Sequence, residues 1–172
     1  MDNLNWEGEM ILSKVVLRKA RIEDCDDIYR WRNDEDTRQQ SFISNEVPYE
    51  RHCSWFKEAL KDPLKVLYIG IDGSNEKYGI VRFDIRNDSV AEININLAPE
   101  KRGRGIGATL IRRSSEEFLS LKGMKLVLAR TKEENIASIK AFLKAGYFEI
   151  FRYIDVEKGR VVVLGLVRGV NN

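Results

Sequence analysis

The chain has 172 residues, of which 43% are hydrophobic and 33% are charged, and its formal net charge is +2. This length and apolar content suit one folded domain and exclude a disordered chain, and the near balance of charge gives no reason to expect a nucleic-acid partner. Two cysteines, Cys25 and Cys53, and one histidine are too few for a disulfide framework or a zinc site. We therefore expect no metal ion and a reducing, cytoplasmic setting.

The chain carries no signal for a membrane. No apolar run approaches the roughly 20 residues that cross a bilayer. The N-terminus, MDNLNWEGEM, is too acidic and polar for a signal peptide. No repeat or linker divides the sequence, so we expect a leader over residues 1–12 and a single domain over residues 13–172.

The apolar pattern of the first hundred residues predicts one strand, then two helices, then three strands. In chain order these segments are Val15–Lys19, Glu23–Asn33, Tyr49–Leu60, Lys65–Asp72, Lys77–Ile85 and Val90–Leu97. The turn between the second and third strands is rich in Asp, Gly, Ser and Asn, as tight turns are. Three adjacent strands without a helix between them indicate an antiparallel run.

The rest of the chain alternates between helix and strand before it ends in a hairpin. The predicted segments are a helix at Gly105–Leu121, a strand at Lys125–Arg130, a helix at Asn135–Ala145, and strands at Tyr147–Tyr153 and Val161–Val167. The complete order predicts an α/β fold. Its central mixed sheet has about seven strands, antiparallel first and partly parallel later, with about four helices on its faces.

A glycine-rich turn follows the strand that ends at Leu97. Its sequence, RGRGIG over residues 102–107, opens the next helix. Glycines let the backbone present its N–H groups without obstruction, and a helix N-terminus adds unpaired amides and a positive dipole end. Together these features suit a diphosphate, and Lys101, Arg102 and Arg104 add positive charge. An ordinary strand–helix turn with basic surface residues is the alternative, and the spacing fits neither the Walker motif nor GxGxxG.

A second motif lies about thirty residues later, with Asn135, Ser138, Phe142, Gly146 and Tyr147 spaced along and after a helix. The two motifs together resemble the GNAT superfamily of N-acetyltransferases, over nearly the whole chain. The resemblance implies the GNAT fold, acetyl-CoA as co-substrate, and direct transfer in a ternary complex. The residues it assigns to acetyl-CoA are Leu97, Ala98, Arg102, Gly103, Arg104, Gly105, Ile106, Gly107, Ala108, Asn135, Ser138 and Phe142.

A narrower resemblance lies in the segments YRWRND over residues 29–34, His52 to Phe56, Gly79 to Phe83 and Ala91 to Ile93. They are similar to acetyltransferases of nucleotide-linked amino sugars, such as those of pseudaminic-acid-type pathways. Related segments also occur in acetyltransferases of ribosomal-protein and antibiotic amines. The residues that this resemblance assigns to the acceptor are Trp31, Arg32, Asn33, Arg38, His52, Arg82 and Asn94.

These acceptor-side residues also have a plainer interpretation. Trp31 can be the buried residue of a surface helix, and His52 can be a packed or capping histidine. Arginines would suit a nucleotide diphosphate because their forked geometry pairs with phosphate oxygens. The sequence leaves both interpretations open.

The strand at Val90–Leu97 supplies the expected catalytic centre. Its polar residues Glu92, Asn94 and Asn96 alternate with apolar ones, so the two sets lie on opposite faces of the sheet. The family resemblance makes Glu92 the candidate base, acting through water. The alternative is a carboxylate that only forms a salt bridge, with Arg82 or another neighbour.

The remaining elements of the reaction come from the same resemblance. A backbone N–H near Leu97 is the expected oxyanion donor, beside a bulge that binds the pantetheine arm. Many GNAT enzymes place a tyrosine, as general acid, where this chain has Phe142. Tyr147, Tyr153 or water is then left to donate the proton, and a thiolate with an ordinary thiol pKa near 8.5 needs little help in leaving.

The sequence thus predicts an acetyl-CoA-dependent N-acetyltransferase whose acceptor is a primary amine of a small molecule, in particular a nucleotide-linked amino sugar. Acetylation of a protein, at a ribosomal-protein N-terminus or a lysine, is one alternative. A non-catalytic acyl-CoA-binding module is another. A homodimer is compatible with the sequence.

Overall fold

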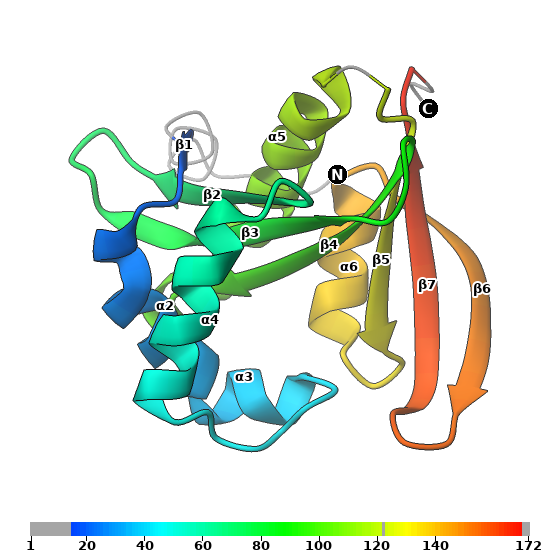
Figure 1. Cartoon of the computed structure of the whole chain (residues 1–172). Coiled ribbons are helices and arrows are strands. Elements are labelled where there is room, and N and C mark those ends of the chain that lie inside the picture. Colours follow the sequence, from blue (N-terminus) through cyan, green and yellow to red (C-terminus); the bar gives the residue numbers. More distant parts are fainter. Residues whose placement is uncertain (1–14, 122, 170–172) are drawn as a thin grey trace.

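The computed structural model describes residues 15–121 and 123–169, and these form a seven-stranded sheet with helices on both faces (Figure 1). The strands are β1 (Val16–Lys19), β2 (Lys65–Ile71), β3 (Lys77–Ile85), β4 (Val90–Leu97), β5 (Leu126–Lys132), β6 (Phe148–Asp155) and β7 (Gly159–Val167). The α-helices are α2 (Cys25–Asn33), α3 (Glu35–Gln40), α4 (Tyr49–Lys61), α5 (Ile106–Ser120) and α6 (Ile136–Lys144). Two short 3-10 helices are η1 (Ile22–Asp24) and η2 (Pro99–Lys101).

The strand order is β1-β2-β3-β4-β5-β7-β6. All neighbours are antiparallel except β4 and β5, which are parallel. This arrangement confirms the predicted mixed α/β fold and its seven strands. Within the described residues there is one helix more than expected, α3, and no helix is long and apolar enough to cross a membrane. The predicted leader over residues 1–12 lies outside the described part of the chain.

Helices α5 and α6 cover one face of the sheet and bury the larger core (Figure 1). Apolar side chains of α5 pack on those of β3, β4 and β5, as their alternating positions predicted. At the centre the rings of Phe83 and Phe118 are stacked, with 4.2 Å between their centroids, and neither is exposed. A core of this kind is stabilised mainly by the apolar area that it removes from water.

Helices α2 and α4 cover the opposite face over β2 and β3 (Figure 1). Their buried residues include Ile28 and Trp31 from α2 and Phe56 and Ala59 from α4. Helix α3 contributes no buried residue. The two helices therefore fix one half of this face by apolar packing, and the face of β4 beside them carries polar side chains.

Candidate active site

The two parallel strands at the centre of the sheet separate part of the way along. β4 and β5 pair from Val90 with Leu126 to Ile93 with Ala129. Beyond this last pair β4 continues to Leu97 and β5 to Lys132 without facing each other. The strands diverge in Figure 1, and we call the opening between them the fork.

The backbone of β4 turns unpaired amides toward the fork. Ala98 N donates to Tyr78 O at 3.0 Å, and Val90 O accepts from Arg86 N at 2.8 Å, so the even-numbered residues of β4 bond to β3. Because successive N–H groups along a strand alternate in direction, those of Ile95 and Leu97 point toward the fork. The sequence-based expectation of a bulge near Leu97 is wrong, since the ladder of β3 and β4 runs without a register shift. The departure of β5, and not a bulge, exposes these amides.

The glycine turn after β4 has the backbone that an anion cradle needs. Gly103 and Gly105 have φ values of +74° and +76°, which L-residues with side chains rarely adopt. A Cβ added at either position would meet no atom within 4 Å, so the turn borders open space. Gly105 is the N-cap of α5 and offers no side-chain bond, and the first turn has no acidic residue. The amides of Ile106, Gly107 and Ala108 are therefore left for an anion.

The three cations next to the turn point in different directions. Lys101 is buried and forms an ion pair of 2.6 Å with Glu76, the residue directly before β3. Arg102 turns toward α3, where its guanidinium lies 2.7 Å from Asp34 Oδ2. Arg104 is exposed and has no partner among the described residues. Of the three, Arg104 alone is placed to meet an anion at the turn without giving up an ion pair.

The other predicted cofactor residues lie on both sides of the fork. Ala98 and Ile106 are fully buried next to the end of β4. Across the fork, Asn135 caps α6 directly after β5, and its Oδ1 accepts from Ser138 N at 3.0 Å. Phe142, further along α6, is buried in the core. The helices α5 and α6 thus begin on opposite sides of the same opening.

The predicted proton donor Tyr147 lies in the core. It is 3% exposed, and its hydroxyl is 2.8 Å from the hydroxyl of buried Ser115. Burial raises the pKa of Tyr147 above its ordinary value. Ser115 is nine residues into α5, about 14 Å from the helix start at the fork. This placement gives no support to a role for Tyr147 in proton transfer, and Phe142 packs edge-on against its ring.

Glu92 stands at the point where the fork opens, on the sheet face that carries α2 to α4. Its carboxylate accepts two hydrogen bonds from Arg130, at 2.9 and 2.7 Å, and one from Arg86 at 2.8 Å. Its side chain is 15% exposed. Glu92 therefore links β4 to β5 by a bidentate pair beside their last paired residues. The structure thus contains the salt bridge that was expected as the alternative, with Arg130 and Arg86 in place of Arg82, and the role of Glu92 as a base stays a prediction.

Arg82 and Asn94 lie beside Glu92 on the same face and share one partner. Arg82 Nε donates to Asp84 at 3.0 Å, and Asn94 Nδ2 is 3.3 Å from the same oxygen. The guanidinium of Arg82 also lies over the ring of Trp55, 5.4 Å from its centroid. The two predicted acceptor residues thus come together with Glu92 in one polar area of β3 and β4.

The predicted acceptor residues of α2 and α3 hold the loop over residues 41–48. Asn33 makes two hydrogen bonds with the backbone of Val47, both 2.9 Å long. Arg32 donates to Ile43 O at 2.8 Å, and Arg38 donates to Ser44 O at 3.4 Å and to Asn33 O at 3.1 Å. Both arginines thus donate to backbone carbonyls. Among the described residues, no carboxylate forms an ion pair with Arg32 or with Arg38.

Trp31 and His52 are core residues, as the plainer interpretation held. Trp31 is 4% exposed and His52 is 3% exposed. The ring of His52 packs against the rings of Tyr29, Trp55 and Phe56. His52 bonds to the backbone of Cys25, and its Nε2 has no partner within the described residues. Burial lowers the pKa of His52 below 6.5, and the charge of Arg32 lowers it further.

Two features of the site are not predicted by the sequence patterns. The first is α3, whose side chains contact Arg102 after β4, with Thr37 Oγ1 accepting a hydrogen bond from it at 2.6 Å. An Asp N-cap followed by two acidic residues marks its start, and this signal could have located it. The second is Arg130, whose partnership with Glu92 has no sequence signal because it joins residues far apart in the chain.

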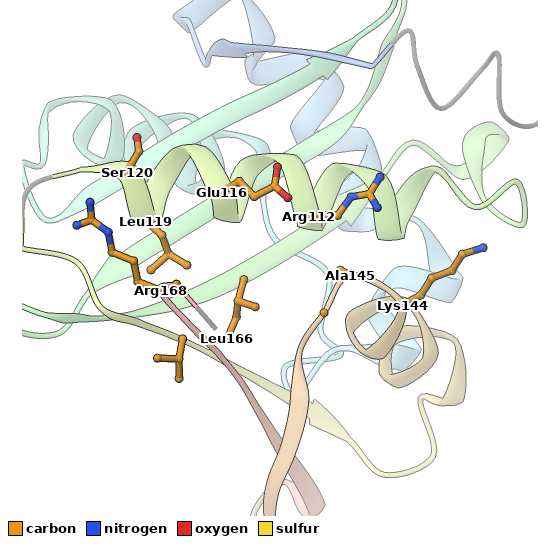
Figure 2. Close-up of a pocket in the computed structure, with 11 residues that line it drawn as sticks. Arg112, Glu116, Leu119, Ser120, Lys144, Ala145, Leu166 and Arg168 are labelled. Carbon is orange, nitrogen blue, oxygen red and sulfur yellow. The ribbon is translucent and has the colours of Figure 1, made fainter. Parts of the chain in front are cut away.

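The two hollows described in the structure lie outside the fork. One, of about 690 Å³, opens between the C-terminal half of α5, the end of α6 and the end of β7 (Figure 2). Arg112, Glu116, Lys144 and Arg168 surround it, and β7 ends beside the paired start of β5. The other, of about 410 Å³, lies between α3 and the loop over residues 41–48. No cluster of metal-ligating side chains occurs among the described residues.

A forked mixed sheet, with a glycine turn opening a helix on one side, is the architecture expected of an acyl-CoA N-acyltransferase. A family model described as "Acetyltransferase (GNAT) domain" matches residues 14–147, more than half of the chain. The chain therefore belongs to the GNAT acetyltransferase family and is an N-acetyltransferase. No match was found among the curated proteins.

Solved structures of the same fold include two kinds of amine acetyltransferase. The spermidine N-acetyltransferase of Vibrio cholerae, in complex with CoA and spermine, is 18% identical, with 91% of this chain and 96% of that chain covered and a TM-score of 0.81. The aminoglycoside acetyltransferase AAC(6')-Ib, in complex with ribostamycin and CoA, is 18% identical, with 90% and 94% covered and a TM-score of 0.79. These similarities extend over nearly the whole of each chain and establish the fold.

The glycine turn yields a first prediction. Gly105→Ala is expected to weaken CoA binding about tenfold, which is about 1.4 kcal/mol, because its methyl group enters the open space of the cradle. The positive φ adds about 1 kcal/mol of destabilisation. Calorimetric titration with CoA and chemical denaturation measure the two effects. Gly73→Ala, in an open turn without a positive φ, is the matched control and should change neither. Equal CoA affinities of the two variants would contradict the cradle.

A second prediction concerns His52. Because burial lowers its pKa in the folded state, the unfolded chain takes up a proton first as the pH falls through about 6.5. The free energy of unfolding should therefore fall between pH 7.5 and pH 5.5, by up to about 1.4 kcal/mol per pH unit. Urea denaturation at a series of pH values measures this slope. His52→Gln removes the only histidine and should flatten it, whereas an unchanged slope would contradict the assignment.

Proposed function

We propose that the fork and the glycine turn bind acetyl-CoA, and that an amine of a small molecule attacks its thioester at the end of β4. The separation of β4 from β5 after Ile93 and Ala129 is the observation that carries this proposal. The amides at the start of α5 and the charge of Arg104 suit the diphosphate. The N–H of Leu97 is the proposed donor to the oxyanion, because it points into the fork.

The polar face of β4 is the proposed approach of the acceptor. Transfer needs a neutral amine nitrogen held against the carbonyl carbon, together with a group that accepts the amine proton. We propose Glu92 for this role, through a water molecule, with Arg130 and Arg86 holding its carboxylate in place. The same arginines also suit a purely structural carboxylate, and variants of Glu92 and Arg130 separate the two roles.

For the acceptor we propose a nucleotide-linked amino sugar. Two observations support an anionic substituent on the acceptor. Arg32 and Arg38 have no carboxylate partner in the described chain, and each donates a hydrogen bond to a carbonyl of the loop over residues 41–48. Nη1 of Arg32 is buried with no hydrogen-bond partner among the described residues. Guanidinium groups held in this way suit the oxygens of a diphosphate.

A cationic acceptor is the second candidate, favoured by the hollow next to α3. Glu35 and Glu46 line it together with Arg38, and Asp36 lies on the same short helix. Carboxylates would suit the ammonium groups of a polyamine or an aminoglycoside. The structures of the same fold described above hold spermine and ribostamycin.

A third prediction decides between these acceptors. CoA release should be measured with a UDP-linked 4-amino sugar, the same sugar without the nucleotide, spermidine, ribostamycin and a ribosomal-protein N-terminal peptide. The nucleotide-linked sugar should have a kcat/KM at least about tenfold above the others, equal to about 1.4 kcal/mol of transition-state stabilisation. Equal rates for the sugar with and without its nucleotide would overturn the diphosphate contact. A preference for spermidine or ribostamycin would establish the second candidate.

A fourth prediction separates the two roles of Glu92. Glu92→Gln and Arg130→Gln each break the bidentate pair, but only the first removes the carboxylate. If Glu92 accepts the proton, Glu92→Gln should lower kcat about 100-fold or more and abolish the acidic limb of the pH–rate profile. Arg130→Gln should keep that limb. Similar losses of kcat in both variants, with unchanged pH–rate profiles, would show that Glu92 only joins the strands.

A further inference from the structure

The two cysteines of the chain lie against each other between α2 and α4. Cys25 begins α2, Cys53 lies in α4, and their Sγ atoms are 3.0 Å apart as free thiols. A disulfide bond is about 2.05 Å long, so the two sulfurs must approach by about 1 Å to form one. They are the only cysteines of the sequence, which leaves each with a single partner in the chain.

The surroundings of the two thiols differ. Cys25 is 7% exposed, and Cys53 is half-buried on the outer side of the pair. Burial, together with the hydrogen bond to Cys53, raises the pKa of Cys25 to about 12. A thiolate is the form that attacks an oxidant. An oxidant in solution therefore meets Cys53 first, and Cys25 is the partner positioned to resolve the product.

We propose that Cys25 and Cys53 are a redox-modification site. Hydroperoxides oxidise the two thiols there to a reversible intramolecular disulfide. The thiolate of Cys53 attacks one peroxide oxygen, the O–O bond breaks, and a sulfenic acid and hydroxide result. The sulfur of Cys25 then attacks the sulfur of Cys53. The hydroxyl group of the sulfenic acid leaves and takes up the thiol proton of Cys25, so that it is released as water. In sum, two thiols lose two protons and two electrons, and hydrogen peroxide is reduced to two molecules of water.

The disulfide closes a segment that the fold already holds at its other end. α2 ends at Asn33, whose side chain bonds twice to Val47, just before α4 begins. The bond between Cys25 and Cys53 ties the start of α2 to the middle of α4. The closed loop contains α3 and the loop over residues 41–48. Because a cross-link restricts the unfolded chain, the oxidised protein should be the more stable form.

Intact-mass analysis and alkylation test the proposal without reference to activity. The reduced protein is treated with hydrogen peroxide, then alkylated with iodoacetamide in urea. We expect a loss of two hydrogens, no alkylation and a monomer on a non-reducing gel, with both thiols recovered after dithiothreitol. The Tm of the oxidised form should rise by about 5–10 °C.

Cys53→Ser changes the half-buried thiol and is the principal control, and Cys25→Ser is the second. Each should keep one alkylatable or overoxidised sulfur and should show no rise in Tm with peroxide. Three results would overturn the proposal: both thiols still alkylated after peroxide, a disulfide between two chains, or sulfinic acid in place of the disulfide in the unsubstituted protein. None of these results depends on the acceptor or on acetyl transfer.

Discussion

The parting of two parallel strands is the constraint on which the rest of the site depends. β4 and β5 share only four pairs, and the bidentate contact of Glu92 with Arg130 spans them where pairing stops. A paired β5 would have used the amides of Ile95 and Leu97 in its own ladder. Because it departs, the centre of an otherwise continuous sheet has open hydrogen-bonding groups, flanked by the starts of α5 and α6.

The basic side chains around this opening make different contacts. Lys101 and Arg102 are next to the glycine turn in sequence, but each pairs with a carboxylate of another element. Arg102 thereby couples the glycine turn to α3 through one guanidinium. In the proposed anion cradle, backbone amides supply most of the contacts and Arg104 supplies the remaining charge. This division would let a nearly neutral chain carry the proposed local anion site.

Most of the fold could be predicted because apolar periodicity is a local property of the sequence. β3 and β4 have the predicted bounds, and α5 differs by one residue at each end. α3 was missed because EDTRQQ has no apolar periodicity, and the bulge near Leu97 was wrong because it came from the family resemblance. Side-chain partners such as Arg130 for Glu92 or Ser115 for Tyr147 join distant segments, so no local pattern announces them. The roles of the individual site residues and the homodimer stay predictions.

Helix α3 is attached to the sheet in a different manner from its neighbours. It buries no residue, and polar contacts hold it: Thr37 to Asn96, Asp34 to Arg102, and the carbonyl of Gln39 to Lys132. The hydrophobic core therefore does not depend on its sequence. Substitutions on the exposed positions of α3 can accumulate with little loss of stability. In evolutionary terms, the proposed acceptor surface can diverge quickly while the fork, which is the proposed cofactor site, stays the same.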